Sequence, residues 1–159
     1  MDGPPECEFV SDDLVVRLDV TIPGEMSRIR VVVDAVMRVV AESGCAPGAE
    51  QEIELAVQEA MANAVRHGCR GDPGKSVRCV VACDEQRGML IIVRDEGAGF
   101  DPQRVPSPLA GENLFAHHGR GIYLISQLMD EVRFARNGTE IHMVKRARSH
   151  TGPDEPAKS

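Results

Sequence analysis

The sequence is poor in aromatic residues and in positive charge. It contains no tryptophan, one tyrosine and four phenylalanines among 159 residues. Proteins that bind single-stranded nucleic acid stack the bases on aromatic side chains, so this composition argues against direct nucleic-acid binding. The formal net charge of −7 argues against a surface for nucleic acid or for an anionic membrane.

Long hydrophobic segments are also missing. No apolar run approaches the roughly 20 residues that a membrane-spanning helix requires. The acidic N-terminus does not resemble a signal peptide. We therefore expect a cytoplasmic protein with no membrane segment, and its length is sufficient for one domain with a substantial core.

Two common site signatures are absent as well. The cysteines are odd in number and none forms a Cys-x-x-Cys pair, so we expect reduced thiols rather than disulfides or a metal site. They are Cys7, Cys45, Cys69, Cys79 and Cys83, of which the last two are predicted to share one strand face. There is no P-loop of the form Gly-x₄-Gly-Lys-Ser/Thr, which argues against an ordinary Walker ATPase.

Hydrophobic periodicity predicts five strands and three main helices. Strands are expected over residues 14–22, 76–84, 89–95, 131–136 and 139–145, and helices over 25–43, 52–68 and 119–129. In the first strand, one face is predicted to carry Leu14, Val16, Leu18, Val20 and Ile22. Hairpin turns predominate, as at Asn137-Gly138. The predicted fold class is therefore α/β, a two-layer sandwich with a mixed, mostly antiparallel sheet and helices on one face.

The termini and one internal stretch show no such periodicity. We expect tails over residues 1–11 and 148–159 around a domain that spans residues 12–147. Residues 100–118 contain several prolines and form a long predicted loop. A loop of that length inside a domain is either functional or disordered.

The helix predicted over residues 52–68 carries two distinct stripes. Ile53, Val57, Ala60 and Ala64 recur at helical spacing and form an apolar stripe. Glu59, Asn63 and His67 are four residues apart and form a polar stripe beside it. Because a carboxylate can accept a proton and an amide oxygen can bind a hard cation, this stripe suits the edge of a cleft.

Two glycine-rich motifs follow this helix. The first, Asp95-Glu-Gly-Ala-Gly-Phe-Asp, comes directly after an apolar strand. The second, His118-Gly-Arg-Gly-Ile, opens the last predicted helix, whose N-terminal amides could bind phosphate. It is not a dinucleotide-binding loop of the Rossmann type, because no strand is predicted before it.

Taken in this order, the helix and the two motifs resemble the Bergerat-type (GHKL) ATPases. Within that superfamily the sequence is most similar to the anti-sigma-factor serine protein kinases. The resemblance rests on LAVQEAMANAVRHG, RDEGAGFD, GRGIYLI and NGTEIHMVKR, and it covers about residues 53–145. It implies the same α/β sandwich, with ATP held between the helices and a mobile lid.

The resemblance also implies roles for individual residues. Glu59 matches the general base, Asn63 the ligand of Mg²⁺, and Asp95 the acceptor for the adenine amino group. Gly97 and Gly99 would let the backbone approach the purine, and Thr139 would support Asp95. Phosphate or lid contacts are implied for Gly119 and Gly121, with His67, His118 and Arg120 as further candidates at the nucleotide.

The activity implied is that of a Mg-ATP-dependent serine/threonine protein kinase. It would phosphorylate an anti-sigma-factor antagonist of the STAS type, sequester a sigma factor in a partner-switching pathway, and act as a homodimer. One alternative is a nucleotide-binding module that sequesters a protein without significant kinase activity. Another is a related switch kinase that works within a large stress-signalling complex.

Overall fold

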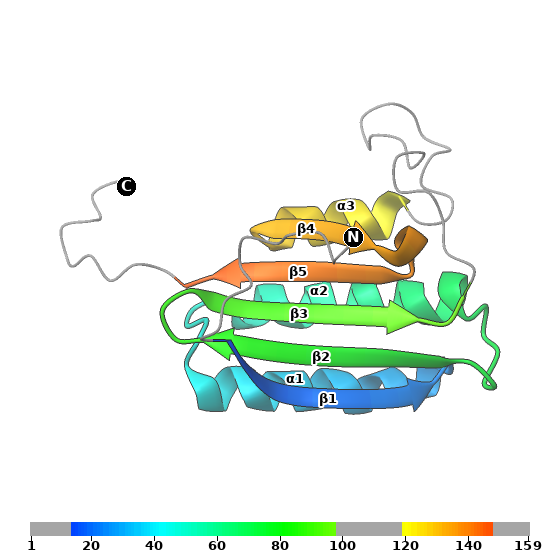
Figure 1. Ribbon diagram of the computed structural model, residues 1–159, viewed down its shortest axis with the longest axis horizontal. Coiled ribbons are helices and arrows are strands. Elements are labelled where there is room, and N and C mark those ends of the chain that lie inside the picture. The colour runs from blue at the N-terminus through cyan, green and yellow to red at the C-terminus, as the bar shows by residue number, and fades with distance from the viewer. Residues whose placement is uncertain (1–13, 98–118, 148–159) are drawn as a thin grey trace.

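The computed structural model describes residues 14–97 and 119–147, and the three long helices in these ranges cover one face of a five-stranded sheet (Figure 1). The strand order is β1-β2-β3-β5-β4, and every pair of neighbouring strands is antiparallel. The α/β sandwich with helices on one face is thus confirmed. The expected tails and the predicted loop at 100–118 lie outside the described residues.

The elements follow the predicted order closely. The strands are β1 (Val15–Pro23), β2 (Ser76–Asp84), β3 (Gly88–Asp95), β4 (Glu131–Ala135) and β5 (Glu140–Arg146). The main helices are α1 (Ile29–Ser43), α2 (Glu50–Asn63) and α3 (Gly119–Leu128), with short helical turns η1 (Met26–Arg28), η2 (Ala64–Gly68) and η5 (Arg136–Gly138). No helix within the described ranges is long and apolar enough to cross a membrane.

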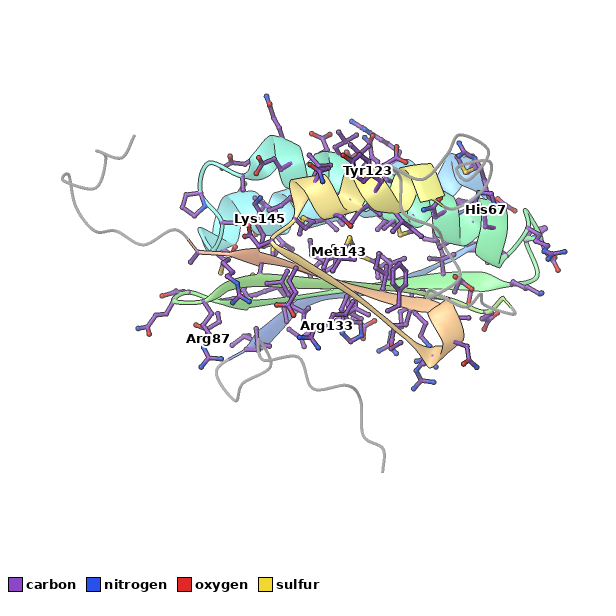
Figure 2. The ribbon with its side chains drawn as sticks, turned by 90° about the horizontal axis from the view of Figure 1, so that it is seen from above. His67, Arg87, Tyr123, Arg133, Met143 and Lys145 are labelled. Carbon is purple, nitrogen blue, oxygen red and sulfur yellow. The ribbon has the colours of Figure 1, made fainter. Side chains whose placement is uncertain are left out.

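The core lies between the helices and the sheet (Figure 2). The helix α1 is rich in valine, which has a lower helix propensity than leucine or alanine, so its stability must come from burial. The structure supports this, since the fully or almost fully buried residues of α1 include Val32, Val33, Val36 and Val40. They pack in one cluster with Ile53 and Val57 of α2.

A β-bulge in β1 contradicts the prediction of a single apolar face. Val16 pairs with Ala82 and Leu18 pairs with Val81, so Arg17 is an extra residue in the ladder. An extra residue reverses the side-chain alternation on either side of it. Leu18 therefore packs on the helix-covered core, whereas Leu14 packs in a separate cluster with Leu90. The prediction that Leu14 and Val16 face the core was wrong, and Val16 is 60% exposed.

The cysteines in the described ranges are free thiols. As predicted, Cys79 and Cys83 lie on the same face of β2, and the structure shows that both are buried in the core. Burial raises the pKa of Cys79 to about 12 and that of Cys83 to about 11. Within these ranges no cluster of three His, Cys, Asp or Glu side chains could hold a metal ion.

Candidate functional site

A pocket opens between the end of α2, the sheet and the start of α3. Its lining residues are Ala60, Asn63, Ala64, His67, Gly68, Val93, Asp95, Ile122, Ile125, Phe134, Gly138, Thr139 and Ile141. The walls are mostly apolar, and the polar groups converge at a few points. Such a pocket can bury a flat apolar ring system and fix its orientation through those few groups. Four predicted site residues meet here: Asn63, His67, Asp95 and Thr139.

Asp95 is the acidic group in this pocket. Its backbone N–H donates to the carbonyl of Thr139 at 2.9 Å, which anchors the end of β3. Its Oδ1 accepts the N–H of Gly97 at 2.7 Å. Burial raises the pKa of the Asp95 carboxyl, while the Gly97 N–H and the charge of Lys75 oppose that rise. The carboxylate is thus a hydrogen-bond acceptor that becomes protonated at a higher pH than an ordinary aspartate does.

Two glycines allow this carboxylate to sit where it does. A Cβ atom on Gly68 would collide with the carboxylate of Asp95, and one on Gly97 would collide with the backbone of Gly68. Neither glycine has a positive φ. Both are therefore required for close packing rather than for an unusual backbone conformation. The prediction for Gly97 was a close approach to a purine, and the approach that the structure shows is to Gly68.

The end of the central helix departs from the predicted geometry. Helical structure does run to Gly68, but the last turn, Ala64–Gly68, is a π-turn. Gly68, the last residue of this turn, does not have a positive φ, whereas Arg70 and Gly71, which follow it, have φ of 55° and 72°. Single π-turns inside helices occur often at functional sites, and this one places His67 and Gly68 against the pocket.

The start of α3 packs on the polar stripe of α2. A Cβ atom on Gly121 would lie 2.9 Å from Nδ2 of Asn63 and 3.3 Å from Oε1 of Glu59. The first turn of α3 thus lies beside the carboxylate and the amide that the sequence singled out. Backbone N–H groups in a first helical turn have no intrahelical partner and favour anions. The carboxylate of Glu59, the amide of Asn63 and the first turn of α3 therefore lie together beside the pocket, which Asn63 lines.

This arrangement fits a nucleotide carrying Mg²⁺. Mg²⁺ prefers hard oxygen ligands and keeps most of its waters and phosphate oxygens, so the amide oxygen of Asn63 can serve as its protein ligand. Gly119 and Arg120 are the first residues of α3. Gly99 and His118 lie outside the described residues, so their predicted contacts stay predictions.

Thr139 reaches Asp95 through the main chain. Its hydroxyl donates to the carbonyl of Arg136 at 2.8 Å, and its own carbonyl accepts the N–H of Asp95. The predicted support of the Asp95 side chain by Thr139 stays a prediction, since the contact between these two residues in the structure joins their backbones.

Sequence reasoning did not single out the apolar residues that line the pocket from β4 and β5. Phe134 and Ile141 are directly opposite each other in the β4–β5 ladder, and both face the helices. Alternation within residues 131–136 and 139–145 could have placed them on that face. Alternation does not show that these two side chains line a pocket rather than fill the core.

Comparison with known proteins agrees with this site. The histidine kinase-like ATPase domain family matches residues 22–145, which is most of the chain. This protein belongs to that family, and the fold described above is the one expected of a member.

The chain is also similar to named bacterial regulators. It is 36% identical over 107 residues to the serine-protein kinase RsbW of Bacillus pumilus, covering 60% of this chain and 64% of that protein. It is 36% identical over 99 residues to the anti-sigma F factor of Bacillus cytotoxicus, covering 59% and 67%. With the RsbW of Bacillus subtilis it shares 29% over 152 residues, covering 91% and 82%. The chain thus spans slightly less than two thirds of the Bacillus pumilus protein.

Proposed function

We propose that this protein is a Mg-ATP-dependent serine/threonine protein kinase that also acts as an anti-sigma factor. The observation that carries the proposal is the packing of Gly121, in the first turn of α3, against Glu59 and Asn63 of α2. It brings a proton acceptor, a cation ligand and phosphate-binding amides to the mouth of a pocket with a carboxylate acceptor inside. Phosphoryl transfer from a nucleotide needs these groups together.

Each group has a distinct part in nucleotide binding. The apolar walls would enclose the adenine ring, and Asp95 would accept a hydrogen bond from its amino group. Guanine presents an oxygen at that position, so a carboxylate there selects adenine. The amides at the start of α3 would face the phosphates. Mg²⁺ held by Asn63 would neutralise charge between the phosphate groups.

Glu59 would act on the protein substrate. As a serine hydroxyl of the partner approaches the γ-phosphorus, the carboxylate of Glu59 takes its proton. The serine oxygen then forms the new bond to phosphorus, the bond to the β–γ bridging oxygen breaks, and ADP leaves. Because the transferred group needs little covalent assistance, positioning and charge neutralisation provide most of the rate enhancement.

The relatives suggest the partners. Their names describe a serine-protein kinase and an anti-sigma F factor. By that analogy the substrate is a STAS-type anti-sigma-factor antagonist, the sequestered protein is a sigma factor, and the protein works as a cytoplasmic homodimer in a partner-switching pathway.

The direct test is transfer of radiolabelled γ-phosphate from Mg-ATP to a purified STAS-type antagonist of the same organism. We expect label on one serine of the antagonist, and none when that serine is replaced by alanine. Calorimetric titration with Mg-ATP supplies the second measurement. ATP binding without any transfer would favour a nucleotide-binding module that sequesters its partner, and absence of ATP binding would contradict the proposal altogether.

The raised pKa of Asp95 predicts two opposite effects of acidification. ATP binding needs the deprotonated carboxylate as an acceptor. As the pH is lowered, ATP affinity should therefore begin to fall at a higher pH than it would with an ordinary aspartate, whose pKa is near 3.8. Protonation favours the folded state when the folded pKa is the higher one. The nucleotide-free protein should therefore gain stability from this group over the same interval. Titration calorimetry and thermal unfolding between pH 4.5 and about 7.5 would check both signs.

A further inference from the structure

A second contact between α2 and α3 lies at the far end of the helix layer. Lys145, at the end of β5, is buried, with only 10% of its side chain exposed. Its Nζ donates to the carbonyl of Leu128 at 2.7 Å and lies 2.8 Å from Oε1 of Glu52. Figure 2 shows Lys145 between the sheet and the helices, at the end of the molecule opposite His67.

These three residues join the end of one helix to the start of another. Leu128 is the last residue of α3, where backbone carbonyls lack intrahelical partners and a cation is favourable. Glu52 lies in the first turn of α2, where an acidic side chain is favourable. The ammonium group of Lys145 therefore bridges two helix ends of opposite polarity.

The two helices thus run antiparallel and are fixed at both ends. At the site end, Gly121 of α3 packs on Glu59 and Asn63 of α2. At the opposite end, Lys145 links Leu128 of α3 to Glu52 of α2. A tilt or slide of α3 along α2 would break the Lys145 contacts. The spacing of the two helices at one end is therefore coupled to their spacing at the other.

A buried lysine is a costly way to join two helices. Lysine is rarely fully buried, because taking its charge out of water costs several kcal/mol unless partners replace the lost hydration. On the same face of β5, Ile141 lines the pocket and Met143 fills the core. An apolar residue at position 145 would continue that pattern and would provide packing alone. A lysine provides a directional contact to the end of α3 as well.

We propose that Lys145, with Glu52, is a positioning residue that holds the first turn of α3 against Asn63 and so sets the phosphate subsite. The inference rests on the proposed nucleotide site. It predicts that loss of the Lys145 contacts weakens the recognition of phosphates more than that of the base. The first turn of α3 would face the phosphates, whereas Asp95, the acceptor for the base, belongs to β3, and α3 contributes Ile122 and Ile125 to the pocket walls.

The test compares ATP and AMP affinities of folded variants by calorimetry in the presence of Mg²⁺. For Lys145→Met we expect ATP affinity to fall by about tenfold, the size of one charge-assisted hydrogen bond, and AMP affinity to change by less than about threefold. The matched control is Arg146→Met, which removes the same charge one residue later, where the side chain pairs with Glu131 at 2.9 Å. Its ATP-to-AMP affinity ratio should equal that of the wild type.

Circular dichroism and thermal unfolding would establish that each variant is folded. Should Lys145→Met not fold, Glu52→Gln decides, since it keeps the bond from Lys145 to Leu128 and removes only the carboxylate charge. Glu52→Gln should lower the ratio of ATP affinity to AMP affinity, as Lys145→Met does, by about two- to fourfold. The inference would be overturned if ATP affinity and AMP affinity fell by the same factor, or if neither affinity changed. Failure of the wild type to bind ATP would instead overturn the proposed function.

Discussion

Replacement of Glu59 by glutamine is expected to reduce phosphate transfer to the antagonist by about 10²- to 10⁴-fold in kcat, the range measured for loss of a general base. The amide keeps the size of the side chain but does not accept the serine proton at neutral pH. Because Glu59 does not line the adenine pocket, ATP affinity should stay within about threefold of the wild type. Single-turnover transfer and calorimetry would measure the two quantities separately.

Glu54→Gln is the matched control for this prediction. Glu54 is on the same helix, 38% of its side chain is exposed, and it lies 4.0 Å from Arg30. An exposed ion pair at this distance contributes little, so transfer and binding should both match the wild type. Normal transfer by Glu59→Gln would show that Glu59 is not the base.

Replacement of Asp95 by asparagine is expected to weaken Mg-ATP binding by about 100-fold or more, because a buried site built to pair one group strongly rejects a mismatch. The asparagine oxygen can still accept the N–H of Gly97, as Oδ1 of Asp95 does at 2.7 Å. Its NH₂ group would then face the amino group of adenine, and two donors do not pair. Calorimetric titration with Mg-ATP measures the loss.

The control for Asp95→Asn is Asp84→Asn. Asp84 is buried at the opposite end of the β2–β3 hairpin, and its Oδ1 accepts the N–H of Gln86 at 2.9 Å. The chemical change and the local turn are thus alike, but Asp84 is not part of the pocket. ATP binding should be retained in this variant. Wild-type affinity in Asp95→Asn would mean that another group recognises the base.

Much of the fold could be predicted from the hydrophobic pattern within single helices and strands. The apolar stripe Ile53, Val57 and Ala60 predicted a buried face of α2, and these residues are buried. Residues three or four apart lie on the same face of a helix wherever the helix packs, so the stripe is a local property. The alternation that predicted β2, β3 and β5 is local for the same reason.

The features that the sequence did not predict depend on contacts between residues that lie far apart in the sequence. The bulge at Arg17 depends on how β1 pairs with β2, and no alternation within β1 reveals it. The roles of Gly68 and Gly97 depend on each other and on Asp95 across the chain. Phe134 and Ile141 line the pocket because two strands pair beside α3.

The sequence by itself determined the element order, the apolar face of α2 and the candidate residues Glu59, Asn63 and Asp95. These follow from periodicity and motif chemistry, which act over one or two helical turns or along one strand. Only the tertiary structure decided that Gly121 meets Glu59 and Asn63, and that Lys145 joins Leu128 to Glu52. Both contacts depend on how α2, α3 and β5 pack, and packing brings together groups whose separation in sequence carries no periodic signal.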